Sequence, residues 1–134
     1  SLFYELVYTL VTEYRNADVS SELVKSYQKL SRLTEITDYI KDNYQKEMSL
    51  ESLSEMFGYS PTYLSKMFQK YAKINYKDYV QNIRLEHAEK ELMSTELMIG
   101  DIALNHGFAN SKAFSNAFRK KYGMLPSDFR KKRS

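Results

Sequence analysis

Two stretches of the chain combine lysine with small polar side chains, groups that form hydrogen bonds and carry positive charge. On a helical wheel that steps about 100° per residue, apolar residues share one side with Leu64 or with Phe114, and the polar residues fall opposite. The first polar face holds Thr62, Ser65, Lys66, Gln69 and Lys70, and the second holds Lys112, Ser115, Asn116, Arg119 and Lys120. Neither face contains an acidic residue, so both suit a polyanionic partner.

These polar faces have the chemistry needed to read base edges in a duplex. A major groove about 12 Å wide admits one helix. Lys66 and Lys112 suit the O6 and N7 acceptors of guanine, and Asn116 suits the N6/N7 edge of adenine. A lysine-bearing face opposite an apolar one is also common on ordinary surface helices, so either helix alone leaves both interpretations open.

The two stretches belong to a repeated unit. At an offset of 49 residues, the repeat aligns Leu50 with Ile99, Leu53 with Ile102, Gly58 with Gly107 and Tyr59 with Phe108. One extra residue then raises the offset to 50, which aligns Leu64 with Phe114, Phe68 with Phe118 and Asp78 with Asp128. Each unit has a short helix, a glycine turn and a longer helix, the layout of a helix-turn-helix. Duplication favours the nucleic-acid interpretation.

Apolar residues recur every three or four positions, which predicts an all-helical fold of two helix-turn-helix subdomains joined by a linker helix. We predict the first subdomain at residues 32–74, the linker helix at 75–94, and the second subdomain with a basic tail at 95–134. Residues 1–31 are predicted to form one or two N-terminal helices from a truncated sensor or dimerisation region. One of these helices carries Leu23 to Leu30, and a separate helix carries Leu33 to Tyr44. Ser49, Ser60, Asn75 and Asn110 are candidate N-caps.

The predicted linker has a length that suits two grooves. A helix over residues 75–93 is about 28 Å long, and successive major grooves on one face of B-DNA are about 34 Å apart. One molecule is therefore expected to span both grooves.

The charge of the chain is uneven. Residues 1–57 hold six Lys/Arg and ten Asp/Glu, whereas residues 58–134 hold fourteen Lys/Arg and seven Asp/Glu. Basic charge gathered in one region is expected of a polyanion binder.

The chain has no cysteine, which excludes disulfides and thiolate nucleophiles, and its apolar runs are too short to span a bilayer. Because it starts at Ser1 without Met, we interpret it as a fragment of a longer protein.

Residues 99–130, IGDIALNHGFANSKAFSNAFRKKYGMLPSDFR, closely resemble the signature of the AraC/XylS family of bacterial transcription regulators. Residues 48–92 resemble the first helix-turn-helix and linker helix of that family. The resemblance implies seven helices, a cytoplasmic location, and control of transcription through promoter DNA and RNA polymerase. It places base contacts on Thr62, Ser65, Lys66, Ser111, Lys112, Ser115 and Asn116. We assign Gln69, Lys70, Arg119 and Lys120 to the phosphates.

The chain departs from the family pattern at several positions. Lys112 replaces a small polar residue and Asn116 replaces a common Arg, so the base preference of relatives is not carried over. Lys73 replaces the usual Gly after the first polar helix, a cost of about 1 kcal/mol if the backbone there is left-handed. Met98 and Leu125 stand where a capping Ser or Thr is commoner, so these helix starts are expected to fray.

No catalytic, metal or cofactor site is predicted. His87 and His106 lack metal-ligand spacing, and we interpret both as structural or exposed. Glu86, Glu89 and Glu91 are interpreted as a solvated helix face, and Arg84 as one partner of a structural ion pair. The run Arg130, Lys131, Lys132 and Arg133 either contacts phosphate or forms a disordered tail, and we favour the tail. Relatives that repair DNA use a methyl-accepting cysteine, which this chain lacks.

An apolar stripe at the N-terminus supports a second hypothesis, a helical protein-interaction module. The stripe contains Leu2, Phe3, Leu6, Val7, Leu10, Val11 and Tyr14. It either pairs two copies of the chain through residues 2–30, forming a homodimer, or packs only on its own chain. No membrane partner is expected.

Overall fold

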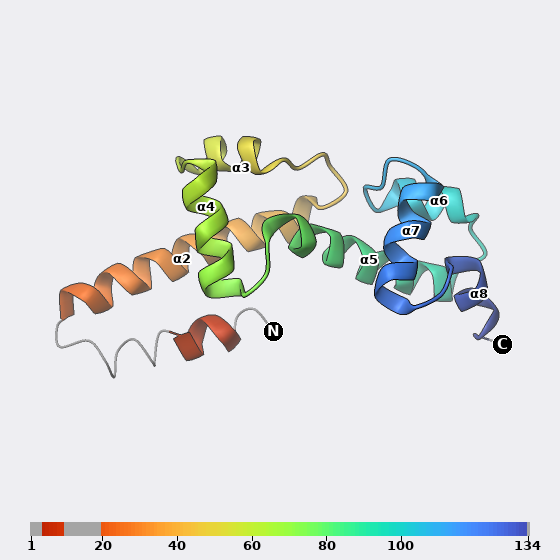
Figure 1. The fold of residues 1–134 in the computed structure, drawn as a ribbon, viewed down its shortest axis with the longest axis horizontal. Helices are drawn as coiled ribbons and strands as arrows, with labels where there is room; N and C mark the ends of the chain where they lie inside the picture. The colour runs from red at the N-terminus through yellow and green to blue at the C-terminus, as the bar shows by residue number, and fades with distance from the viewer. Residues whose placement is uncertain (1–3, 10–19, 134) are drawn as a thin grey trace. The chain divides into compact units, whose positions relative to one another are not determined.

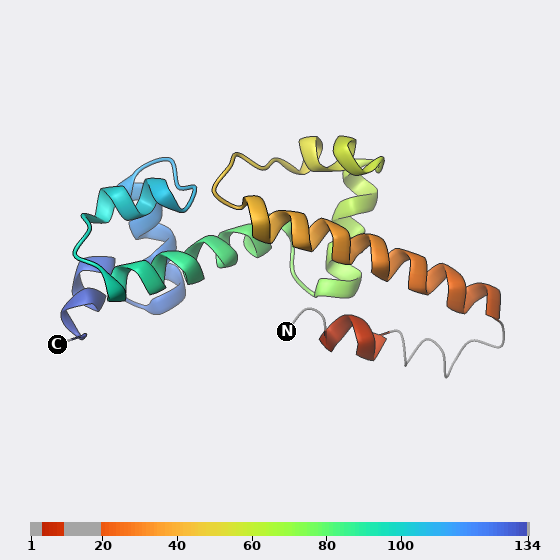
Figure 2. The same cartoon turned by 180° about the vertical axis from the view of Figure 1, so that it is seen from behind.

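The computed structural model describes residues 4–9 and 20–133, and every structural statement below refers to these ranges. They are helical and contain no strand, which confirms the predicted fold class (Figures 1 and 2). Within them, no helix is both long and apolar enough to cross a membrane. The chain forms two compact units, each described by itself. The first comprises Ser1–Asp42 and Met48–Lys77, and the second comprises Asn43–Glu47 and Asp78–Ser134.

Helix α2 (Ser20–Asn43) is continuous, so the prediction of two separate helices here was wrong. Leu30, Leu33, Ile36 and Ile40 are buried at steps of three and four residues, and no glycine or proline interrupts this period. The Thr34 hydroxyl donates to the Leu30 carbonyl at 2.9 Å, so it is satisfied without a break.

Only part of the predicted N-terminal stripe falls in the described residues. Residues 4–9 are helical; Leu6 is buried, whereas Val7 and Tyr8 are exposed. The other members of the stripe, Leu2, Phe3, Leu10, Val11 and Tyr14, lie outside the described ranges.

In the first unit, α3 (Leu50–Phe57) and α4 (Pro61–Met67) follow α2, and α4 runs directly into the π-helical segment η1 (Phe68–Ala72). The helical spacing of Leu64, Met67, Phe68 and Tyr71 predicts a single α-helix over residues 61–72. Over so few residues a side-chain pattern cannot separate i→i+4 from i→i+5 hydrogen bonding, which explains the difference. The segment ends at Lys73, whose φ of 61° is left-handed. The cost of about 1 kcal/mol that we predicted for a left-handed backbone at this residue therefore applies.

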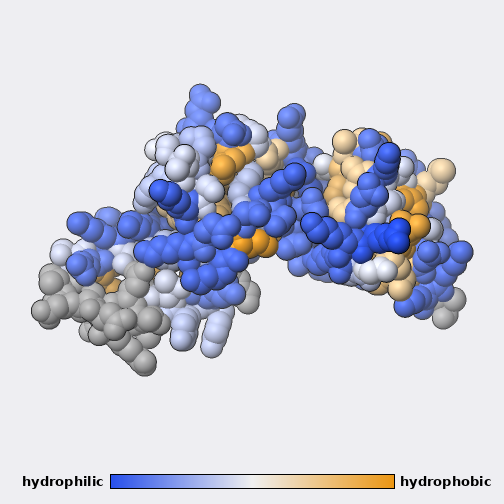
Figure 3. Space-filling model, viewed as in Figure 1, coloured by the Kyte–Doolittle hydropathy of each residue, from blue (hydrophilic) through white to orange (hydrophobic). Residues whose placement is uncertain are grey.

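In the second unit, α5 (Tyr76–Ser94) extends from the first unit and packs with α6 (Ile99–Asn105), α7 (Ser111–Tyr122) and α8 (Pro126–Lys131). Phe118 lies at the centre of an aromatic core. Its ring centroid is 5.6 Å from that of Phe114, 4.4 Å from that of Tyr122 and 5.2 Å from that of Phe129. These rings hold α7 and α8 together. The face of the molecule in Figure 3 shows many hydrophilic residues on both units, with apolar residues gathered in patches.

The repeat seen in the sequence is also a repeat of backbone geometry. Gly58 and Gly107 have φ of 78° and 89° in the turn after the short helix. The residue after each glycine donates to a carbonyl in that helix: Tyr59 to Ser54 at 2.8 Å, and Phe108 to Ala103 at 2.9 Å. The two turns therefore have the same hydrogen-bonding pattern.

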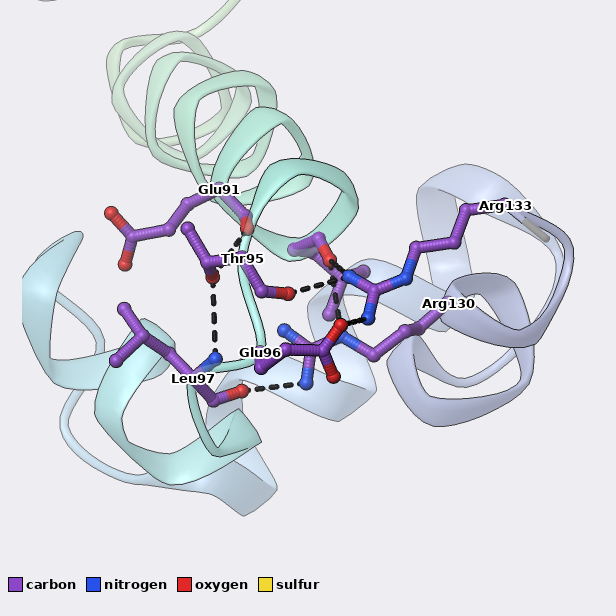
Figure 4. A network of polar contacts seen from close by, with 7 residues as sticks. Glu91, Thr95, Glu96, Leu97, Arg130 and Arg133 are labelled. Atoms are coloured by element: carbon purple, nitrogen blue, oxygen red, sulfur yellow. Dashed lines mark hydrogen bonds and ion pairs between the residues drawn. The ribbon is translucent and has the colours of Figure 1, made fainter.

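The basic C-terminal residues include two structural arginines, so the predicted disordered tail was wrong for these two positions (Figure 4). Arg130 donates to the carbonyls of Leu92 and Leu97, at 3.0 and 2.5 Å. Arg133 donates to the carbonyl of Leu92 at 3.2 Å and that of Thr95 at 2.5 Å, and it pairs with the Glu96 carboxylate. Both cations therefore satisfy carbonyls at the C-terminal end of α5, where positive charge is favourable.

Candidate nucleic-acid interface

Helix α4 begins with a well-formed cap. The Ser60 hydroxyl accepts from the Tyr63 amide at 3.1 Å, which confirms the predicted N-cap, and Pro61 occupies the first turn. Leu64 and Met67 are buried, which fixes the rotation of the helix about its axis. The candidate base-contacting residues of this helix lie on its solvent side: Thr62 and Lys66 are exposed, and Ser65 is half-buried.

Helix α7 repeats this arrangement. The Asn110 side-chain oxygen accepts from the Ala113 amide at 2.8 Å, and Gly123 ends the helix with a φ of 81°. Phe114 and Phe118 are fully buried. The candidate base-contacting residues again face solvent: Ser111, Lys112 and Asn116 are exposed, and Ser115 is half-buried.

The four candidate phosphate-contacting residues, Gln69, Lys70, Arg119 and Lys120, are all exposed. Gln69 and Lys70 lie on η1, and the Lys70 ammonium is 4.9 Å from the centre of the Tyr71 ring. Arg119 and Lys120 lie in the last turn of α7, where cations offset the negative end of the helix dipole. The next residue, Lys121, is 3.6 Å from Glu86 and has an intramolecular partner.

Arg84, which lies on α5, packs against the turn before α7 and binds the segment that follows α2. Its Nε donates to the Tyr44 carbonyl and its Nη2 to the Lys46 carbonyl, both at 2.8 Å. These two hydrogen bonds to backbone carbonyls give Arg84 a structural role, and the ion pair predicted for it from the sequence stays a prediction. A Cβ at Gly107 would lie 2.8 Å from both the Arg84 Nε and the Tyr44 carbonyl oxygen. Only glycine fits this close approach.

A buried polar cluster that the sequence did not predict lies behind this turn. The His106 Nδ1 is 3.1 Å from the Tyr44 hydroxyl, and its Nε2 is 3.5 Å from Glu91. Glu91 also accepts from Asn105 at 2.9 Å, so the prediction of a purely solvated carboxylate was wrong for Glu91. His87 stacks on the Tyr44 ring at 4.4 Å. The cluster joins residues 62 positions apart, and no local spacing in the sequence indicates it.

Desolvation shifts the pKa of two side chains in this cluster, His87 and Tyr44. Desolvation lowers the pKa of His87, and Lys90 and His106 lower it further. Desolvation raises the pKa of Tyr44, and the Glu91 carboxylate adds to the rise. No group of three or more potential metal ligands occurs among residues 4–9 and 20–133. The cluster is therefore interpreted as structural support for the turn.

Arg32 holds the turn before α4, a role for which the sequence offers no local signal. It lies on α2 and donates to the Phe57 carbonyl at 2.9 Å and to the Tyr59 hydroxyl at 3.3 Å. Its guanidinium is 5.6 Å from the centre of the Tyr59 ring. An arginine thus lies beside the glycine turn of each repeat. Arg32 binds the Phe57 carbonyl in the first, whereas Arg84 packs against Gly107 in the second and donates to carbonyls of the segment after α2.

The two capped helices with polar faces define a pair of helix-turn-helix units, and comparison with known proteins gives the family. A helix-turn-helix domain family matches residues 53–132. The chain belongs to the AraC-type family of helix-turn-helix transcription regulators, the family that its sequence resembles.

Two solved structures and one curated relative illustrate the similarity. The C-terminal domain of AraT, a response regulator from Geobacillus stearothermophilus, is 34% identical with a TM-score of 0.74, over 76% of this chain and 85% of that one. An AraC-type transcriptional regulator from Chromobacterium violaceum is 26% identical with a TM-score of 0.70, over 78% and 93%. The bifunctional transcriptional activator and DNA repair enzyme AdaA of Bacillus subtilis is 39% identical over 95 residues, 71% of this chain. The chain spans 45% of the length of AdaA, less than half.

Proposed function

We propose that this chain binds a specific duplex sequence, with α4 and α7 each entering a major groove, and that it regulates transcription in this way. The observation that carries the proposal is the pairing of two capped, repeated helices whose exposed faces contain donors and cations but no carboxylate. Cations on such faces suit the duplex phosphates, and amide, hydroxyl and ammonium groups suit base edges.

We assign base contacts and phosphate contacts to residues at different positions along each helix. Base contacts are assigned to Thr62, Ser65 and Lys66 on α4, and to Ser111, Lys112, Ser115 and Asn116 on α7. Phosphate contacts are assigned to Gln69, Lys70, Arg119 and Lys120, which lie one turn further along. The linker helix α5 has 19 residues, about 28 Å, a length compatible with placing the two helices in adjacent grooves.

Selection of bound duplexes from a random pool tests this function directly. We expect enrichment of two short half-sites separated by about one helical turn, roughly 10 base pairs. Lys66→Ala should relax base preference in one half-site and Lys112→Ala in the other, each with a loss of about 1–3 kcal/mol. An equal loss on every sequence would reassign these lysines to phosphates, and recovery of no preferred sequence would refute specific binding.

We further propose bacterial cytoplasm as the location and RNA polymerase as the partner, both of which rest on the resemblance alone. A polymerase recruitment assay with the longer protein on a selected promoter tests the second point. We propose no enzymatic activity for this chain, and its sequence has no cysteine that could accept an alkyl group. Incubation with alkylated duplex should transfer nothing to the protein, as intact-mass measurement would show.

Self-association is a second candidate function. Val7, Tyr8, Val24 and Tyr27 are exposed on the helix of residues 4–9 and on the N-terminal half of α2. Large apolar side chains exposed together favour burial against another surface. Sedimentation over a wide concentration range should show a dimer that Tyr8→Ser and Tyr27→Ser dissociate; a monomer at all concentrations would remove this function from the fragment.

A further inference from the structure

A row of cations runs along α2, outside the residues that match the helix-turn-helix family. Lys25, Lys29 and Arg32 are spaced by four and three residues, so they share one face of the helix. We call these three residues the α2 basic row. Lys25 and Lys29 are exposed, and neither forms an ion pair with any residue that the structure describes. Like charges four residues apart oppose helix formation slightly, a cost that a bound polyanion would remove.

The α2 basic row leads to the start of α4. Its three cations line an open depression on the first unit together with Gln28 and Tyr59. Arg32 contacts the Tyr59 hydroxyl at 3.3 Å, and Ser60, the next residue, is the N-cap of α4. The row therefore leads to the N-terminal end of α4, where Thr62, one of the candidate base-contacting residues, lies.

The charge of this face remains positive when its acidic neighbours are included. Glu35 is 3.3 Å from Arg32 and offsets part of its charge. Glu22 lies in the first turn of α2, one turn before Lys25. The guanidinium of Arg32 is already engaged by the Phe57 carbonyl, so Arg32 supports the depression while the two lysines remain available.

We propose that the α2 basic row binds the phosphate backbone of DNA beside the half-site that α4 contacts, and so extends the duplex interface beyond the helix-turn-helix units. This inference rests on the proposed function. From Lys25 to Arg32 the row measures about 10 Å, and duplex DNA presents one negative charge per about 1.7 Å of its axis. The row therefore matches a short run of phosphates, with no dependence on base sequence.

The test compares Lys25→Gln/Lys29→Gln with the unaltered chain on a selected duplex. One duplex extends about ten base pairs beyond the half-site of α4, and a second is trimmed at its edge; Lys66→Ala identifies that half-site. On the extended duplex, the slope of log affinity against log salt should be smaller in magnitude for the variant by about 1.8, because two phosphate contacts are lost. The ratio of the affinity of the unaltered chain to that of the variant should therefore fall about tenfold between 50 and 200 mM salt. On the trimmed duplex, the two proteins should differ little.

Two further variants make the result specific. Lys41→Gln/Lys46→Gln removes the same charge from exposed positions outside the row and should leave the slope on the extended duplex nearly unchanged. Lys25→Arg/Lys29→Arg retains the charge and should restore the original slope. Hydroxyl-radical footprinting should show loss of protection only in the flank, and far-UV circular dichroism should be the same for all variants.

Each outcome decides between the two proposals. If the unaltered chain binds no duplex, the proposed function fails and the α2 basic row fails with it. If the unaltered chain binds its selected duplex but Lys25→Gln/Lys29→Gln leaves the slope unchanged, only the row is refuted, as expected if its partner is an acidic protein surface. An equal change on the trimmed duplex would reduce the row to a general electrostatic effect and also overturn the inference.

Discussion

Gly58 and Gly107 occupy the same turn of the two repeats with nearly the same backbone angles, yet their surroundings differ. A Cβ at Gly58 would meet nothing within 4 Å, whereas a Cβ at Gly107 would meet the Arg84 side chain and the Tyr44 carbonyl at 2.8 Å. The first turn is therefore constrained by its own backbone, and the second is also constrained by close packing. Two glycines that align in the sequence repeat therefore differ in whether the surrounding packing leaves room for a side chain.

The largest predicted effect separates these two glycines. Gly58→Ala should lower the free energy of unfolding by about 1 kcal/mol, the cost of a left-handed alanine. Gly107→Ala should cost about 3 kcal/mol or more, because the new methyl group also forces Arg84 and the backbone apart. Native-state hydrogen exchange measures the two units separately and should show lost protection mainly in the unit that carries the substitution. Equal losses would mean that the packing around Gly107 relaxes freely.

A second prediction concerns the hydrogen bonds that Arg130 donates to carbonyls at and just beyond the C-terminal end of α5. Arg130→Ala removes donors from the carbonyls of Leu92 and Leu97 and should lower the free energy of unfolding by about 2 kcal/mol. Its neighbour Lys131 is exposed and 3.9 Å from Asp128, so Lys131→Ala should change stability by less than about 0.5 kcal/mol. Urea denaturation of the two variants measures the difference. Similar midpoints would support the disordered tail that we predicted from the sequence.

The sequence predicted the elements whose signals are local. Glycine turns, the caps at Ser49, Ser60 and Asn110, and the buried faces of α4 and α7 depend on residues within a few positions of one another. The hydrogen bonds from Arg32, Arg84, Arg130 and Arg133 to backbone carbonyls join residues 25 to 41 positions apart, and only the folded chain brings these partners together. The same limit explains why the tail was misjudged and why the His106 cluster was missed. The proposed base contacts were predicted from residue types in the sequence. In the structure these residues are exposed or half-buried on α4 and α7, which is compatible with the proposal.

The ends of the two repeats give a third comparison. Lys73 and Gly123 both have left-handed backbones, at φ of 61° and 81°, although only one is glycine. Lys73→Gly should raise the free energy of unfolding of the first unit by about 0.5–1 kcal/mol by removing this strain. Gly123→Ala should lower that of the second unit by a similar amount, since it introduces the same strain. Thermal denaturation of both variants tests the pair; a destabilised Lys73→Gly would show that the Lys73 side chain contributes more than its backbone costs.

The smallest effect is a pH dependence confined to the second unit. Because the pKa of His87 is lowered in the folded chain, the unfolded chain binds more protons below about pH 6.5. The stability of this unit should therefore fall as the pH drops from 7 towards 5, and the fall should be modest, since His87 is largely exposed. The informative quantity is the difference between the unaltered chain and His87→Gln. Urea midpoints measured at several pH values should decline less steeply for His87→Gln, whereas parallel declines would show that His87 is not the source of the pH dependence.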